Sequence, residues 1–327
     1  MINFLTIFKN NIHRSIEKKN YIIATVLMIS VAILLAVYFT SKLEIKGNIA
    51  VVTDNNKFNI NSKYVKVTVV DKIPSTSELV MNRYDAVLID KGNNRFDIDT
   101  VKSDEFKKEL EEFIRNPKAT GFKKDEDRGV GSNILGYLIM FVLLQGLMFM
   151  TLYSDDKENK MFKRIATSPV SIGTYLFTHS VFNYLLVFIP TFTVLVVCRE
   201  VLNINIGFSY FQYIWLLGIL TLLSTAFALF MCSIIDKGDN SMTMGSSIVT
   251  LSSILAGSFY SFRNDNAIMK NIIGIFPQKN YLKLVQGLEH GKALSDLLPQ
   301  LTYLLTISML MFVIAVIVAK KKFKSGC

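Results

Sequence analysis

Six apolar stretches alternate with polar segments along the chain, and one long polar block separates the first stretch from the second. They cover residues 21–40, 133–153, 174–197, 211–235, 242–260 and 298–319. A helix of about 20 residues, rising about 1.5 Å per residue, crosses a hydrocarbon core roughly 30 Å thick with its backbone polar groups bonded internally. The pattern therefore predicts a polytopic α-helical membrane protein with six transmembrane helices.

The segments between these stretches define the predicted domains. Residues 1–20 place apolar side chains close to one helical face, which predicts a cytoplasmic amphipathic helix on the inner leaflet; a solvated tail is the alternative. Residues 21–40 form the first transmembrane helix, residues 41–132 a small extracellular α/β domain, and residues 133–327 a five-helix transmembrane domain. The apolar residues of the first segment are Ile2, Leu5, Phe8, Ile12 and Ile16.

The polar block has the pattern of a small α/β domain. Runs rich in β-forming residues at 48–53, 65–70 and 86–90 predict strands. A helix starting at Ser75, with Glu78 at capping-box spacing, and a second helix at 103–114 are expected between and after them. Acidic and basic residues are nearly balanced in the block, so a strongly charged docking surface is not indicated.

Composition and charge agree with a membrane protein. Hydrophobic residues make up 51% and charged residues 19% of the chain, and the mean hydropathy is +0.37, which disfavours buried helices of a soluble protein. The net charge of +10 comes from residues at span ends rather than along one helix face, so no nucleic-acid partner is expected. The positive-inside rule places both termini in the cytoplasm. The basic residues then inside are Lys9, Arg14, Lys18, Lys19, Lys157, Lys160, Lys163, Arg164, Lys237, Lys320, Lys321, Lys322 and Lys324.

Motifs of catalysis and metal binding are missing from the sequence. There is no Gly-x-x-x-x-Gly-Lys-Ser/Thr, His-Glu-x-x-His, Gly-x-Ser-x-Gly or Cys-x-x-Cys. His13, His179 and His290 are far apart, and the spans lack paired carboxylates. We expect no catalytic or metal site, so energy for uphill transport must come from another polypeptide or an ion gradient.

The segment 154–168, after the second apolar stretch, predicts a short cytoplasmic helix. Acids crowd its start and bases its end, which complements a helix dipole, and Pro169 prevents its continuation. Met161, Phe162 and Ile165 form an apolar group among charges, which favours a docking site. A membrane-surface helix that only connects two spans is the alternative.

Polar residues inside the spans are candidates for a substrate pathway, because their exposure to lipid is costly. Small polar residues recur at helical spacing in the fifth span, where tight helix packing is an equally good explanation. In the third span two polar residues share a face, and hydrogen bonding between helices is the favoured role there. The candidates are Gln145, His179, Asn183, Ser246, Thr250 and Ser253.

Over essentially its whole length the chain resembles a type 2 ABC exporter permease. That family has an acid, then Gly-Thr, then a basic-aliphatic run ending in Thr-Pro-Val-Ser after its second span. Lys160 and Met161 stand in place of the Gly-Thr. Segments 255–257 and 275–281 resemble the end of the family's fifth span and the segment before its last span, with an extracellular re-entrant element at 261–297, and residues 84–90 resemble a strand of its external domain. The matching loop residues are Glu158, Arg164, Ile165, Pro169, Val170 and Ser171.

The resemblance implies a membrane permease subunit of an ATP-driven ABC exporter, not itself an enzyme. It would form the pathway as a dimer, with a second permease copy or a sister permease, in the cell membrane of a bacterium. Cytoplasmic ATPase subunits would carry ATP and Mg, with no cofactor on this chain. A membrane receptor or immunity protein, whose extracellular domain binds a peptide without transport, is the alternative. The expected ATPase-coupling residues are Glu158, Met161, Phe162, Arg164, Ile165 and Pro169.

Overall fold

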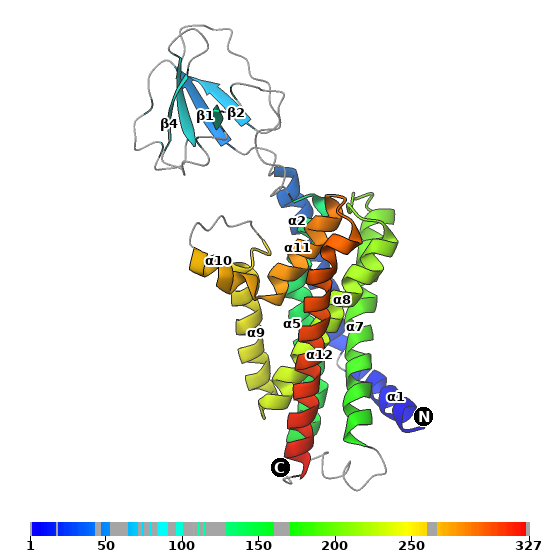
Figure 1. The fold of residues 1–327 in the computed structure, drawn as a ribbon. Helices are drawn as coiled ribbons and strands as arrows, with labels where there is room; N and C mark the ends of the chain where they lie inside the picture. The colour runs from blue at the N-terminus through cyan, green and yellow to red at the C-terminus, as the bar shows by residue number, and fades with distance from the viewer. Residues whose placement is uncertain are drawn as a thin grey trace. The chain divides into compact units, whose positions relative to one another are not determined.

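In the computed structural model the chain forms two compact units (Figure 1). The first unit combines Met1–Val37 with Arg128–Cys327, and the second is Tyr38–Asp127. The residues that the structure describes are 2–17, 19–42, 47–52, 65–70, 84–90, 96–100, 128–159, 171–259 and 267–324, together with Pro74, Leu79, Lys107, Leu110, Glu111 and Ile114.

The first unit is a group of helices (Figure 1). Within its described residues the helices are α1 (Ile2–Glu17), α2 (Lys19–Lys42), α5 (Val130–Glu158), α7 (Ile172–Glu200), α8 (Tyr210–Ile234), α9 (Gly238–Leu255), α10 (Ala267–Gly274), α11 (Pro277–Glu289) and α12 (Leu294–Lys324). Helices α2, α5, α7, α8 and α12 are long and apolar enough to cross a membrane. Five of the six predicted spans are thus confirmed as helices of spanning length.

The sixth predicted span is helical but shorter and more polar. Helix α9 has 18 residues, about 27 Å at 1.5 Å per residue, and its first turn contains Asp239 and Asn240. The predicted end at residue 260 is wrong. The helix stops at Leu255 because Gly257 takes a φ of 79°, and the amide of Ser258 then donates to the carbonyl of Ser253 in a Schellman-type end. Whether α9 crosses the membrane stays a prediction.

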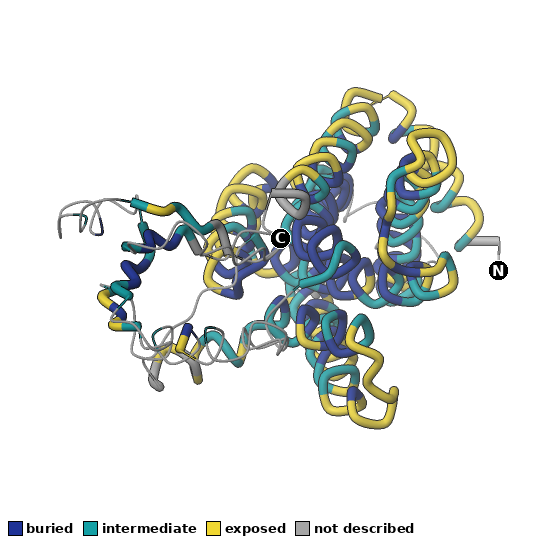
Figure 2. Tube along the Cα trace, turned by 90° about the horizontal axis from the view of Figure 1, so that it is seen from above, coloured by how far each residue is buried: buried dark blue, intermediate teal, exposed yellow. Residues whose placement is uncertain are grey.

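Helix α5 is the centre of the first unit and packs against α7, α8, α9 and α11. It is buried over most of its length, and Figure 2 shows the buried positions gathered in the middle of the helix group. The closest approach is to α8, where a Cβ added at Gly146 would lie 2.1 Å from Ser224 Oγ. The Ser224 hydroxyl in turn donates to the carbonyl of Val142 at 2.7 Å. A glycine is therefore needed at this crossing.

The predicted amphipathic helix at the N-terminus is present as α1, but it presents two apolar surfaces. Phe8 packs against Phe182 of α7 with ring centroids 5.5 Å apart, and Phe4 lies near Phe177. Leu5 and Ile16 are 59% and 61% exposed on the other side. The single apolar face expected from the sequence is therefore divided between contact with α7 and an outward stripe.

The second unit contains a four-stranded sheet in the order β2-β1-β3-β4. Strand β1 (Gly47–Val52) pairs in parallel with β2 (Val65–Val69) and β3 (Ala86–Asp90), and β4 (Phe96–Asp99) is antiparallel to β3. The three predicted strands are confirmed. Strand β4 was missed because it is only four residues long and half of them are aspartates. Alternate side chains of β1 enter two apolar clusters, one containing Leu110 and the other Leu79.

Three boundaries need correction or lie outside the described residues. Helix α5 runs on to Glu158, so the predicted start of a separate helix at 154 is wrong; residues 160–170 are outside the described part. Helix α12 already begins at Leu294, so the predicted start of the last span at 298 is too late, and the re-entrant arrangement of 261–297 stays a prediction. Most of the predicted helices at 75 and 103–114, and the linker before Arg128, also lie outside it.

Candidate functional site

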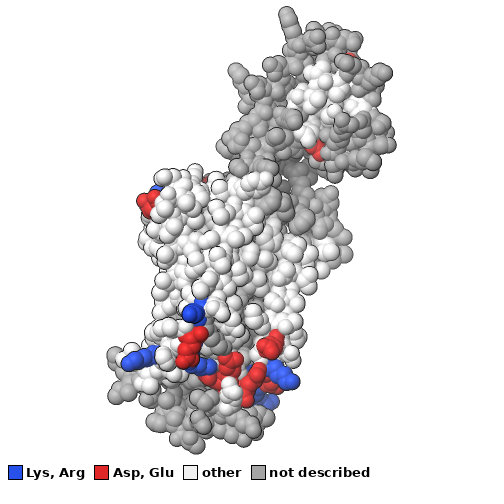
Figure 3. All heavy atoms as spheres, turned by 180° about the vertical axis from the view of Figure 1, so that it is seen from behind, with Lys and Arg blue, Asp and Glu red and all other residues white. Residues whose placement is uncertain are grey.

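Charged side chains gather at one end of the first unit, beyond a broad uncharged band that covers the helices (Figure 3). This end is built from the last turn of α5, the turn between α8 and α9, and the last turn of α12. Lys157, Glu158, Asp236, Lys237 and Lys322 line a common pocket there. An uncharged band bounded by charges is the surface expected of helices in a bilayer, with this end in the headgroup region.

Among the predicted coupling residues, the structure describes Glu158. The others lie outside the described residues: Met161, Phe162, Arg164, Ile165 and Pro169. The Glu158 carboxylate accepts a hydrogen bond from the backbone N–H of Gly238, the first residue of α9. The N-cap residue Lys237 supplies no side-chain cap. Glu158 therefore provides both an acceptor and a negative charge for the positive end of α9.

The opposite end of α9 is held by Arg128, which lies just before α5. Its guanidinium donates to the carbonyl of Ser258 at 3.0 Å and to that of Gly257. Burial lowers the pKa of Arg128 to about 10, so the group stays charged at neutral pH. Residues at both ends of α5 thus bind the two ends of α9. Between them the helices are close, because a Cβ at Gly245 would lie 2.8 Å from a methyl of Leu147.

A buried polar network joins α1 to α5 and α7. Asp156 accepts hydrogen bonds from Arg14, at 2.9 Å in the ion pair, and from the hydroxyl of Tyr175. His179 Nε2 lies 3.6 Å from the same carboxylate, and His179 Nδ1 is 3.4 Å from the amide nitrogen of Asn11. Arg14 also donates to the carbonyl of Leu152. His179 therefore belongs to a network that fixes α1 beside the end of α5.

The other polar candidates of the second and third spans make contacts between helices. Asn183 donates to the carbonyl of Gly146 at 2.8 Å and accepts from Thr225 at 3.3 Å. Gln145 donates weakly to the carbonyl of Thr25 in α2 at 3.5 Å, and its Oε1 has no partner among the described residues. Both side chains are buried within one copy of the chain. Their assignment to a pathway stays a prediction.

The small polar stripe of α9 is divided in the structure. Ser246 and Thr250 are partly exposed, whereas Ser253 is fully buried and its hydroxyl has no partner among the described residues. The neighbouring Ser252 accepts a 2.6 Å hydrogen bond from Gln278 of α11. These last two residues line an otherwise apolar cavity of about 140 Å³ bounded by α5, α8, α9, α11 and α12.

A comparison with protein families decides the identity of the chain. The model described as "ABC-2 family transporter protein" matches residues 42–317, most of the chain. The chain belongs to the ABC-2 family. It is therefore a membrane permease component of an ABC transporter, and the resemblance found in the sequence is confirmed. A search among curated proteins found no match.

Sequence reasoning missed several residues that organise this ABC-2 permease. Arg14, Asp156 and Tyr175 come from three helices, and Arg128 and Gln278 from two other segments. The charged residues beside the spans are visible in the sequence, but the sequence does not show which residues they contact. Arg14 and Asp156, for example, are separated by 142 positions.

The described part of this ABC-2 permease holds no group of three His, Cys, Asp or Glu residues that could bind a metal ion. Cys198 and Cys232 are free and buried. Hydrogen bonds and ion pairs between helices, such as those of Asp156 and Asn183, position the helices relative to one another.

Proposed function

We propose that this ABC-2 permease is the membrane subunit of an ATP-driven exporter, paired with a second copy or a sister permease and coupled to separate cytoplasmic ATPase subunits. Family membership supports an ABC partner. The distribution of Lys and Arg supports cytoplasmic termini, with the second unit outside, and we place the protein in a bacterial plasma membrane. The sequence has no phosphate-binding loop, so ATP would be hydrolysed on the partner.

The hydrogen bond between Glu158 and Gly238 carries the coupling proposal. Segment 160–170 follows Glu158 almost directly, and Ser171 comes directly after it. The Ser171 hydroxyl caps α7 by accepting a hydrogen bond from the amide of Thr174 at 3.1 Å. An ATPase that moves this segment would pull on helix ends on both sides of it. Through Glu158 the displacement would reach α9, and through Ser171 it would reach α7.

The outward face of α9 supports the pairing of two permease copies. Met244, Ile248, Leu251 and Leu255 follow one helical stripe and are exposed. Ser246 and Thr250 lie on the same helix and are partly exposed. At about 100° per residue these two hydroxyl groups point away from the stripe, so a second copy placed against the stripe would bury its apolar side chains only.

Copurification tests the coupling proposal. Phe162→Asp should abolish association with an ABC ATPase, because a charge replaces an apolar docking side chain. The control is Val201→Asp, at an exposed position between α7 and α8 on the other side of the membrane, and it should retain the ATPase. If both variants retain the ATPase equally, segment 160–170 is not the coupling element.

Cysteine labelling tests the orientation. In a cysteine-free background, Leu202→Cys should react with an impermeant thiol reagent in intact cells, because it is exposed in the turn after α7. Lys237→Cys, exposed in the turn before α9, should react only after permeabilisation. The reverse labelling would put the charged end outside and refute ATPase docking there.

A further inference from the structure

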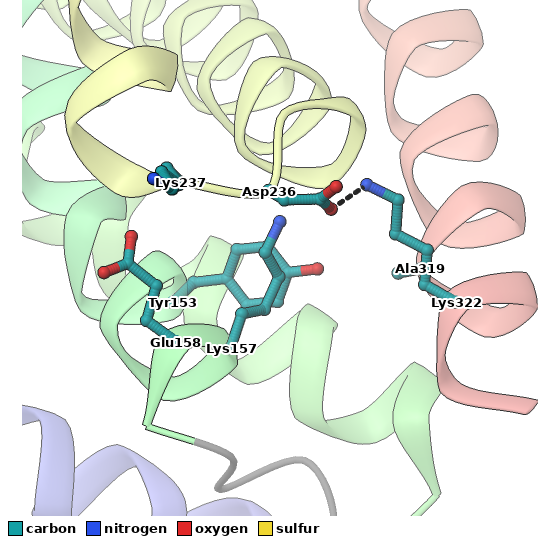
Figure 4. A pocket seen from close by; sticks show the side chains of 7 residues that line it. All are labelled: Tyr153, Lys157, Glu158, Asp236, Lys237, Ala319 and Lys322. Carbon is teal, nitrogen blue, oxygen red and sulfur yellow. Dashed lines mark hydrogen bonds and ion pairs between the residues drawn. The ribbon is translucent and has the colours of Figure 1, made fainter. Parts of the chain in front are cut away.

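A pocket of about 230 Å³ opens at the charged end of the first unit (Figure 4). Its walls come from the last turns of α5 and α12 and from the turn between α8 and α9. Tyr153 and Ala319 provide an apolar wall, and charged side chains surround the rest. Glu158 of this pocket bonds to the first residue of α9, and the lysines take no part in that contact.

Two of the lysines are fixed by the end of α8. Lys157 Nζ donates to the carbonyls of Cys232 and Ile235 at 2.6 and 2.7 Å. Lys322 Nζ donates to the carbonyl of Ile234 at 2.7 Å and to the carboxylate of Asp236. The last carbonyls of a helix attract cations, so both ammonium groups are held in place before any ligand arrives. An ammonium has three donors, and these contacts use two of those of Lys157.

Positive charge exceeds negative charge around this pocket. Three lysines face two acids, and one of those acids, Glu158, is already bonded to the N–H of Gly238. Asp236 is shared between the lysines, and its hydrogen bond from Lys322 lowers the pKa of the carboxyl group. The ammonium of Lys237 makes no hydrogen bond or ion pair with the described residues. An anion in the pocket would meet the positive charge of all three lysines.

The position of the pocket at the ends of the spanning helices favours a lipid as the source of that anion. The pocket lies at the ends of α5, α8 and α12, each of spanning length, where phospholipid headgroups are found. On the membrane side, Ile234 and Ile317 are 44% and 60% exposed and provide an apolar surface for acyl chains. The combination of a cationic pocket and an adjoining apolar helix surface matches a phosphodiester carrying hydrocarbon chains.

We propose that this pocket binds the phosphate of an anionic phospholipid from the adjacent leaflet. Lys157 and Lys322 hold the phosphate, and Lys237 adds charge from the turn before α9. The bound lipid joins the end of α12 to the end of α5 beside Glu158. The proposal needs only a membrane-embedded chain, so its failure would leave the coupling and export proposals untouched.

Native mass spectrometry of the purified protein tests the proposal by titration with phosphatidylglycerol and, separately, phosphatidylcholine. Lys237→Gln should weaken phosphatidylglycerol binding about fivefold, from about 1 kcal/mol per lysine near an anionic surface. Because the Lys237 side chain has no partner among the described residues, this variant should fold normally; Lys322→Gln is the second variant. The matched control is Lys292→Gln, an exposed lysine between α11 and α12, which should bind like the native protein.

Three results would overturn the proposal. Equal retention of phosphatidylglycerol and phosphatidylcholine would show that charge does not select the lipid. Unchanged phosphatidylglycerol binding by Lys237→Gln and Lys322→Gln would place the lipid elsewhere. Thermal stabilisation by inorganic phosphate as large as that by phosphatidylglycerol would identify a site for soluble anions instead.

Discussion

Loss of the Asp156 carboxylate should loosen α1 from the rest of the first unit. Asp156→Asn keeps the size of the side chain but removes the charge that Arg14 and Tyr175 contact. Removing one partner of a buried ion pair typically costs about 3–5 kcal/mol. The Arg14 side chain is 23% exposed and keeps the carbonyl of Leu152 as an acceptor, which lowers the expected loss below that range, to about 2–3 kcal/mol.

The assay is thermal unfolding in detergent, with fluorescence-detected size exclusion as the readout. A loss of about 2–3 kcal/mol corresponds to a fall of roughly 5–10 °C for a unit of this size. The control is Glu17→Gln, which removes the exposed 3.7 Å pair between Glu17 and His13 on the same helix. An exposed pair is worth about 0–1 kcal/mol, so this variant should melt within about 3 °C of the native protein.

A double-mutant cycle measures the interaction free energy between Arg14 and Asp156. Arg14→Gln combined with Asp156→Asn should cost much less than the sum of the two single variants, because the second change removes a charge that the first has already left unpaired. Strictly additive losses, or equal melting temperatures for Asp156→Asn and Glu17→Gln, would refute the idea that this network fixes α1.

Three further predictions concern packing, the face of α9 and pH. Gly146→Ala should lower stability by about 1–3 kcal/mol, since the added Cβ would meet Ser224. The control is Gly173→Ala, whose Cβ would lie 3.8 Å from its nearest neighbour and which should be neutral to stabilising in melting experiments. Equal effects of the two substitutions would contradict the close crossing of α5 and α8. Thr250→Val should change transport without changing the melting temperature. Ser253→Leu should lower the melting temperature because that position is fully buried. An unchanged melting temperature of the Ser253→Leu variant would show that this helix contact tolerates a larger side chain. The hydrogen bond from Lys322 lowers the pKa of Asp236 from 3.8, so its stabilising contribution is complete above that value and lost only as the pH falls through the lower folded-state pKa. The melting difference between the native protein and Lys322→Gln should therefore stay constant from about pH 6.5 to about pH 5, and a difference that shrinks in that range would contradict the assignment.

The sequence predicted the elements of the fold better than their ends. Long apolar stretches identify helices of spanning length because the bilayer demands about 20 apolar residues in a row. The end of α9 was missed because Ser258 and Phe259 continue the composition of the helix, while a single glycine with positive φ terminates it. The end of α5 was missed because Asp155 and Asp156 were interpreted as the acidic start of a separate helix, although α5 itself continues with Asp156 buried against Arg14.

The candidate site was harder to predict because its geometry depends on pairs far apart in the chain. Glu158 was found through a family pattern, but its partner Gly238 is 80 positions away. His179 and Asn183 were chosen as polar residues in an apolar span, and the bonds that occupy them come from α1, α5 and α8. Sequence composition identifies such residues as unusual, while only the packing of the helices shows which groups they contact.

The attachment of both ends of α9 to α5 limits where a substrate can travel. Separating these two helices would require breaking the Arg128 bonds at one end, the Glu158 bond at the other, and the close contact at Gly245 between them. A gap between α5 and α9 would therefore be costly to open. The two helices would move as one piece, and molecules would have to pass along the side of α9 that faces away from α5.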